Sequence, residues 1–177
     1  MLILLLGTNL GNREHHLDNA RSQLCKRVGS ITKKSSIYQT ASWGIKEQPD
    51  FLNQALMIEA TIPPYDVLKQ ILTIENQMGR IRSEKKYISR TIDIDIIFFD
   101  RCIVDEPGLN IPHPKLTERR FVLEPLAELI PDFVHPILGK DMKELLRECL
   151  DPSDVRLYKT DDGSGEHSGS EKGFQQK

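Results

Sequence analysis

The segment 91–99, with the sequence TIDIDIIFF, most constrains what this chain can fold into. Side chains of a β-strand alternate between its two faces, so Asp93 and Asp95 would share one face and the isoleucines between them the other. Aspartate is depleted in strands, and two carboxylates about 7 Å apart on one strand repel each other. A cation would relieve this repulsion, and Mg²⁺ accepts one or two carboxylates alongside water and phosphate oxygens. The pattern therefore predicts Asp93 and Asp95 as metal ligands.

A solvated strand face is the alternative interpretation of this acidic pair. Ile97 and Phe99 lie on the same face of the expected strand, which indicates a surface that is covered beyond the aspartates. Two Mg²⁺ ions about 3.5–4 Å apart could stabilise both sides of an in-line displacement at phosphorus. We therefore expect a magnesium-dependent enzyme that transfers a phosphate-containing group.

Hydrophobic periodicity and turn residues predict the order strand, helix, strand, strand, helix, strand. The expected ranges are 1–7, 13–28, 31–40, 51–62, 64–78 and 91–99. This order predicts an α+β fold, a ferredoxin-like antiparallel sheet with helices packed mainly on one face. The other face of the sheet would then be free for a site.

Two more helices are expected after the acidic strand. Pro125 suits the first turn of a helix that ends before Pro131, and Asp141 with Glu144 resembles a capping box. Beyond residue 150 the chain contains little that could form a core. We therefore expect a single domain over residues 1–150 and a flexible polar tail over 151–177.

Composition limits the classes of protein. A chain of 177 residues with 38% hydrophobic residues can bury one core, and no apolar stretch approaches the roughly 20 residues that span a bilayer. The start of the chain has no basic leader, and the three cysteines are far apart, which favours a cytoplasmic protein without disulfides. A formal net charge of −2 disfavours a nucleic-acid partner unless positive charge gathers on one face.

A basic, aperiodic segment, residues 80–90, leads into the acidic strand. Guanidinium groups bind phosphate in a bidentate manner, and Arg80 and Arg90 stand where a helix end and a strand entrance anchor them. Lys85 and Lys86 are better explained as solvated loop residues. A connection of this length is typical of a functional lid.

Other candidates lie elsewhere in the chain. His113 and Arg119 could bind phosphate, although His113 alone suits packing as well as function, and Phe121 alone would be a core residue. An acceptor pocket, in which aromatic rings hold a flat ring and an amide contacts its edge, has candidates on and near the two middle strands: Thr40, Trp43, Phe51 and Asn53.

Two further functions are open from these residues. Another metal-dependent phosphotransferase or nucleotidyltransferase would keep the aspartates and need no aromatic pair. A ferredoxin-like RNA-binding module would display aromatic and basic residues on its strands, and Asp93 and Asp95 would repel a phosphate backbone.

Five motifs in this order and spacing closely resemble the 6-hydroxymethyl-7,8-dihydropterin pyrophosphokinase family, also called 2-amino-4-hydroxy-6-hydroxymethyldihydropteridine diphosphokinase. The resemblance spans about residues 2–150. The motifs are GTNLG at 7–11, QPDFLN at 48–53, Glu75 with GRIR at 79–82, RTIDID at 90–95, and PHP at 112–114 with RRF at 119–121.

The resemblance implies that diphosphate passes from ATP to the hydroxymethyl oxygen of the pterin and that AMP is released, in folate biosynthesis. It implies two Mg²⁺ ions bound by Asp93 and Asp95, with Arg80 and Arg90 stabilising charge on the transferred group. We expect a monomer with these two small-molecule substrates and with neither a nucleic-acid nor a membrane partner.

The resemblance also assigns binding residues. ATP would contact Glu75, Arg82, Tyr87, His113 and Arg119. The pterin would lie between Phe51 and Phe121, with Thr40, Trp43 and Asn53 around it. One departure lies in the expected lid, where Tyr87-Ile88-Ser89 stands in place of the Trp-Gly-Pro that the family often carries.

Overall fold

A computed structural model of the chain describes residues 1–41, 49–79 and 91–159. Its elements, in chain order, are β1 (Leu2–Thr8), α1 (Arg13–Arg27), β2 (Gly29–Lys34), β3 (Tyr38–Thr40), β4 (Phe51–Ala60), α2 (Pro64–Gln77), β5 (Asp93–Phe99), β6 (Val104–Glu106), β7 (Leu109–Ile111), the 3₁₀ turn η1 (Leu116–Glu118), α3 (Arg120–Leu129), α4 (Met142–Glu148) and β8 (Val155–Leu157).

The main sheet is antiparallel, with the strand order β5-β1-β4-β3-β8 and with β2 also paired to β4. Strand β1 lies between β4 and β5, and β6 and β7 form a separate hairpin. The fold is therefore α+β with an antiparallel sheet, as the sequence predicted.

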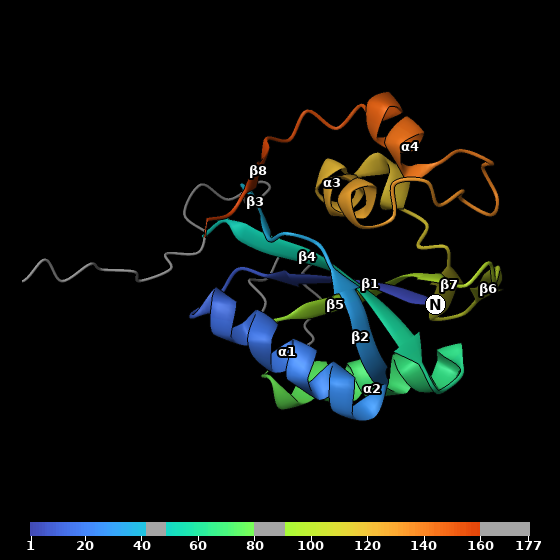
Figure 1. Cartoon of the computed structure of the whole chain (residues 1–177). Helices are drawn as coiled ribbons and strands as arrows, with labels where there is room; N and C mark the ends of the chain where they lie inside the picture. Colours follow the sequence, from blue (N-terminus) through green and yellow to red (C-terminus); the bar gives the residue numbers. More distant parts are fainter. Residues whose placement is uncertain (42–48, 80–90, 160–177) are drawn as a thin grey trace, which may run out of the picture.

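Helices cover both faces of this sheet (Figure 1). Helices α1 and α2 lie on one face and α3 and α4 on the other. Leu2, Leu4 and Leu6 of β1 belong to the core under α1 and α2, whereas Ile3 and Leu5 belong to the core under α3 and α4. The prediction that helices pack mainly on one face is wrong, because a central strand that is apolar at every position buries both of its faces.

The expected helix starts are confirmed for α1 and α4. Asn12 accepts a hydrogen bond from the His15 N–H at 3.0 Å, and both bonds of the Asp141–Glu144 capping box are present. Pro125 is not in the first turn of α3, because that helix begins at Arg120. The Arg120 N–H donates to the Asp151 carboxylate at 2.8 Å, so a residue far along the chain satisfies this helix start.

The expected strand 31–40 is divided into β2 and β3. At the division, Ser35 still pairs with β4 through its N–H to the Ala55 carbonyl at 2.9 Å. The next N–H, that of Ser36, turns to the Glu128 carboxylate of α3, with the shorter contact at 2.9 Å. A side chain from α3 thus replaces one hydrogen bond between strands of the sheet.

The prediction that the flexible tail begins at residue 151 is wrong for its first part. Strand β8 pairs with β3, and the Tyr158 N–H continues the ladder to the Ile37 carbonyl at 2.8 Å. Residues 160–177 lie outside the described residues. None of the described helices has the length and apolar character that crossing a membrane requires.

Candidate functional site

Asp93 and Asp95 lie on the edge strand β5, and both are half-buried while Ile94 between them is buried. Asp93 pairs with Gly7 and Asp95 with Leu5 on β1. Directly paired residues share a face, and Leu5 belongs to the core under α3 and α4. Both carboxylates therefore point to the α3 and α4 face, toward its end beyond the apolar core.

A row of residues continues from Asp93 across the sheet. Gly7 is paired with Asn53 on β4, and Asn53 with Tyr38 on β3. A Cβ atom on Gly7 would lie 3.1 Å from Asn53 Oδ1, a closer approach than side chains normally make. Glycine at this position leaves room for the Asn53 amide beside the aspartates.

The middle strands bring three of the predicted pterin residues together. Asn53 Nδ2 donates to Thr40 Oγ1 at 2.9 Å, and both side chains are buried. Thr40 is paired with Phe51, whose ring is half-buried. An amide of fixed orientation beside an aromatic ring can contact the edge of a flat heterocycle. Trp43, the fourth candidate from this part of the chain, lies outside the described residues.

His113 lies beside β5, because its N–H donates to the Ile97 carbonyl at 3.1 Å. Burial lowers the pKa of His113 below its ordinary value of 6.5, and the Arg119 cation lowers this pKa further, while the Asp93 carboxylate opposes both. His113 is therefore close enough to sense both charges. Its Nδ1 accepts from the Lys115 N–H at 3.2 Å, so the neutral ring carries its proton on Nε2 and can donate to an anionic oxygen.

Arg119 and Phe121 lie at the start of α3. The Arg119 guanidinium carbon is 5.8 Å from the centre of the Phe121 ring, and the half-buried ring packs against the core under α3 and α4. This contact combines cation–π attraction with packing. It holds one phosphate-binding candidate next to one pterin-binding candidate.

The structure separates Glu75 from these groups. Glu75 is on α2, on the opposite face of the sheet from the aspartates, and its side chain is buried. Its Oε1 accepts from the Ile94 N–H at 3.0 Å. Glu75 therefore contacts the backbone of β5 from the face of the sheet opposite the aspartate side chains.

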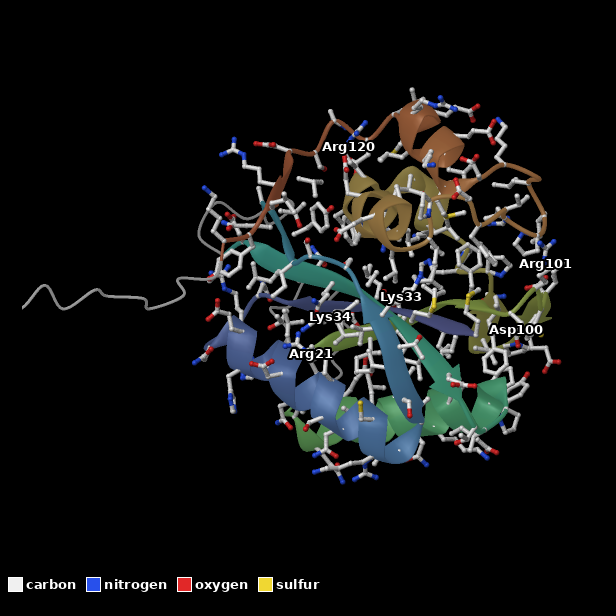
Figure 2. All side chains as sticks on the ribbon, viewed as in Figure 1. Arg21, Lys33, Lys34, Asp100, Arg101 and Arg120 are labelled. Carbon is white, nitrogen blue, oxygen red and sulfur yellow. The ribbon has the colours of Figure 1, made fainter. Side chains whose placement is uncertain are left out.

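Sequence reasoning missed two residues that support the site. Arg120, labelled in Figure 2, donates to the Asp151 carbonyl at 3.0 Å and to the Cys149 carbonyl at 3.2 Å, which anchors the start of α3. Glu128 accepts from Tyr38 Oη at 2.8 Å as well as from Ser36, which joins α3 to β3. These partners are 29 to 92 positions apart in the chain, so no local pattern could reveal them.

Arg80, Arg82, Tyr87 and Arg90 lie outside the described residues, so their predicted roles remain predictions. Within the described ranges there is no group of three or more His, Cys, Asp or Glu side chains that could hold a metal ion. Two carboxylates on one face, with Glu75 directed elsewhere, fit a hard cation that completes its coordination with water and substrate oxygens. Mg²⁺ meets this description.

An acidic pair on an edge strand, a histidine and an arginine beside it, and a buried amide on the adjoining strands together define a candidate phosphoryl-transfer site on an α+β sheet. The sequence model of the 7,8-dihydro-6-hydroxymethylpterin-pyrophosphokinase (HPPK) family matches residues 3–131. The chain belongs to this family, and it is accordingly an ATP-dependent pyrophosphokinase, a transferase.

Relatives of similar length support this assignment. The chain is 37% identical over 169 residues to a 2-amino-4-hydroxy-6-hydroxymethyldihydropteridine pyrophosphokinase of Bacillus subtilis, covering 95% of this chain and 96% of the relative. It is 38% identical to the protein of the same name in Methylorubrum extorquens, covering 85% and 93%.

Longer proteins also match. The folic acid synthesis protein fol1 of Schizosaccharomyces pombe is 38% identical over 90% of this chain, which spans 22% of that protein. Among solved structures, wild-type Plasmodium falciparum HPPK-DHPS superposes with a TM-score of 0.64 at 17% identity, covering 82% of this chain and 44% of that one. This structural likeness supports the fold.

Proposed function

We propose that this chain transfers diphosphate from ATP to the hydroxymethyl group of 6-hydroxymethyl-7,8-dihydropterin, releasing AMP and the pterin diphosphate for folate biosynthesis. The observation that carries the proposal is the row in which Asp93, Gly7 and Asn53 are paired across three strands. This row connects a candidate metal site directly to a candidate acceptor pocket. The family match and the relatives of similar length support the substrate.

The acceptor would bind against Thr40, Phe51 and Asn53, with Phe121 from the start of α3 and with Trp43. Since Asn53 Nδ2 already donates to Thr40, the amide oxygen beside Gly7 is the group that is directed to accept from N–H groups on the pterin edge. The two phenylalanine rings would hold the ring faces. This arrangement explains why a buried polar pair lies beside aromatic rings.

Asp93 and Asp95 would hold two Mg²⁺ ions, which would supply positive charge to offset the charge around the β-phosphorus. The pterin hydroxyl oxygen would attack that phosphorus, the bond from the β-phosphorus to the bridging oxygen would break with its electron pair remaining on AMP, and the hydroxyl proton would pass to solvent water. Catalysis of this kind depends mostly on positioning and electrostatics. The carboxylates have the shared face that this task needs.

The remaining candidates would bind and neutralise the triphosphate. His113 donates from Nε2, and Arg119 offers a permanent cation at the start of α3. We propose that Arg82 and Tyr87 contact ATP and that Arg80 and Arg90 stabilise charge on the transferred group, as the family resemblance implies. The depressed pKa of His113 keeps this ring neutral near pH 7, so it acts as a donor rather than as a second cation.

Phosphorus NMR of the protein with ATP, Mg²⁺ and 6-hydroxymethyl-7,8-dihydropterin tests the reaction. We expect AMP and a pterin diphosphate in equal amounts, which requires attack at the β-phosphorus. Formation of ADP would mean transfer of a single phosphate and would overturn the mechanism. Folded protein without pterin-dependent turnover would overturn the proposed acceptor.

We further propose that strands β1, β2 with β3, β4 and β5, together with α1 and α2, form a ferredoxin-like unit, and that the protein acts as a monomer. The strand order supports the ferredoxin-like unit. Strand β1 lies between β5, which is at the edge, and β4, which pairs on its other side with β2 and β3. Sedimentation at micromolar concentration tests the second. A dimer mass would contradict it.

A further inference from the structure

Glu75 is the one carboxylate in the part of the chain that the structure describes whose residue is buried, with 1% of its surface exposed. It lies on α2 among the apolar residues that pack under α1 and α2. A buried carboxylate is costly unless hydrogen bonds stabilise it. A side chain that is kept at such a position needs a structural or functional reason.

One hydrogen bond that Glu75 accepts is at the centre of the candidate metal site. Its donor, the Ile94 N–H, is the backbone group between Asp93 and Asp95. Among the described strands, β5 is at the edge of the sheet, so none of them lies beside an N–H of β5 that points away from β1. The Glu75 carboxylate accepts the hydrogen bond that the Ile94 N–H would otherwise donate to a neighbouring strand.

The two ends of β5 are held differently. At the end away from the aspartates, the Asp100 N–H donates to the Met1 carbonyl at 2.7 Å, and the Met1 amine donates to Asp100 Oδ1 at 2.6 Å. Figure 2 shows Asp100 and Arg101 at this end, beside the β6–β7 hairpin. At the aspartate end, Glu75 of α2 contacts the outer edge of β5.

We propose that Glu75 is a positioning residue of the metal site: by accepting the Ile94 N–H, it fixes the backbone of β5 between the two aspartates and so sets their relative orientation. This inference rests on the proposed function. Two carboxylates that bind the same cations must keep their positions to within about 0.5 Å. An edge strand that is loosely held does not fix its side chains this well. The role replaces the predicted contact between Glu75 and ATP, since a side chain with 1% exposure offers a nucleotide almost no surface.

Two substitutions separate the hydrogen bond from the charge. Glu75→Gln keeps an oxygen that can accept from Ile94 and removes the charge, whereas Glu75→Leu keeps a similar volume and removes the acceptor. Asp66→Asn is the matched control, because Asp66 is on the same helix and is paired with Lys69 at the surface. All three retain the apolar contacts of α2.

Hydrogen exchange of backbone amides, followed by NMR in the protein without substrates, measures directly how firmly the amides of β5 are hydrogen-bonded. We expect the Ile94 amide to exchange about 10-fold faster in Glu75→Leu, which corresponds to the loss of one backbone hydrogen bond, and less than about 3-fold faster in Glu75→Gln. The Leu4 amide on β1 reports general destabilisation, and its rate should change less than that of Ile94. Unchanged Ile94 exchange in Glu75→Leu would overturn the proposal.

Metal binding provides the second readout. We expect the Mn²⁺ affinity measured by EPR, and the Mg²⁺ concentration for half-maximal velocity, to weaken about 10-fold in Glu75→Leu while the KM for the pterin stays within about 2-fold. Weakened metal binding in Glu75→Gln with normal Ile94 exchange would overturn the proposal by showing that the charge acts instead. If the KM for ATP rises in Glu75→Leu and metal affinity does not change, the result would instead support the predicted contact between Glu75 and ATP.

The readouts also separate this inference from the proposed function. If the unmodified protein makes no pterin diphosphate, the proposed function fails, while Ile94 exchange and Mn²⁺ binding still test the role of Glu75. If Glu75→Leu does not fold, the comparison between Glu75→Gln and Asp66→Asn decides: Ile94 exchange within about 3-fold of the rate in Asp66→Asn, with unchanged Mn²⁺ affinity, supports the positioning role, because the retained amide oxygen still accepts from the Ile94 N–H. Equal exchange at Ile94 in these two variants, with weakened Mn²⁺ binding in Glu75→Gln, overturns it.

Discussion

The two faces of the sheet differ in what covers them. The face under α1 and α2 is apolar along β1, and its buried carboxylate, Glu75, is turned toward the backbone of β5. The face under α3 and α4 is apolar at one end, around Phe98, and polar at the other, around Asp93 and Asn53. One face is therefore specialised for holding the strands in place, and the other is divided between packing and a site.

The helices on both faces combine apolar packing with polar contacts. On one face, Arg21 of α1 donates to the Gln54 amide oxygen of β4 at 2.6 Å. On the other, α3 is attached by polar contacts at each end, through Arg120 to Asp151 and through Glu128 to Ser36. Polar contacts have directional geometry, so they can set where the start of α3, with Arg119 and Phe121, stands over the sheet. Packing supplies most of the stability, and the polar contacts supply placement.

The largest expected effect falls on the polar end of the α3 and α4 face. Asp95→Ala removes one of two candidate metal ligands from a half-buried position, so we expect a loss of activity of roughly 1,000-fold or more with the thermal midpoint nearly unchanged. Coupled AMP detection and circular dichroism measure the two quantities. Asp105→Asn, on the hairpin strand β6, is the control and should retain full activity. Wild-type turnover by Asp95→Ala would remove the metal assignment.

The opposite result is expected on the α1 and α2 face. Ile71→Ala deletes a side chain that is 1% exposed in the core of α2, and we expect it to lower the free energy of unfolding by about 3 kcal/mol. At temperatures where the variant stays folded, both KM values should be unchanged. Urea unfolding and steady-state kinetics check this. A large change in KM without loss of stability would break the proposed division between the two faces.

A smaller effect is expected at Gly7, which lies between Asp93 and Asn53 in the row paired across β5, β1 and β4. Gly7→Ala places a methyl group 3.1 Å from Asn53 Oδ1, so the amide must shift by a few tenths of an ångström. We expect the KM for the pterin to rise about 10-fold, the loss of one well-placed hydrogen bond, with little change in the KM for ATP. Steady-state kinetics with each substrate varied in turn measures both. Equal changes in the two constants would contradict a role confined to the acceptor pocket.

The smallest expected effect concerns pH. Burial and Arg119 lower the pKa of His113 in the folded protein below the ordinary 6.5, so the unfolded chain binds more protons as the pH falls. The stability of the protein should therefore decline as the pH drops through 6.5, down to the lowered pKa of the folded state. His113→Gln should reduce this decline. Urea midpoints across this range measure it, and an identical pH dependence in the variant would contradict the prediction.

His135 provides the comparison for this experiment. Burial lowers its pKa too, and its Nδ1 accepts from the Ile137 N–H at 3.2 Å in the loop before α4. We expect His135→Gln to alter the pH dependence of stability without changing the pH profile of activity. His113→Gln should change both, because this ring lies beside Asp93 and Arg119.

Several features could be predicted from local sequence. The alternation of Asp and Ile placed both carboxylates on one face of β5, and the residue types at Asp141 and Glu144 predicted the start of α4. These features depend on neighbours within a few positions, where backbone geometry alone decides which side chains meet. The family resemblance, carried by the order and spacing of five motifs, was confirmed by the family match.

The tertiary structure decided what depends on distant partners. The cover on both faces of the sheet, the start of α3 at Arg120 and the pairing of β8 arise from contacts between segments far apart in the chain. The same holds for the burial of Glu75 against Ile94, which no spacing in the sequence predicted. Local patterns determine which faces and ends an element offers, whereas packing of the whole chain determines which of them meet, because the free energy of burial is gained only when distant surfaces come together.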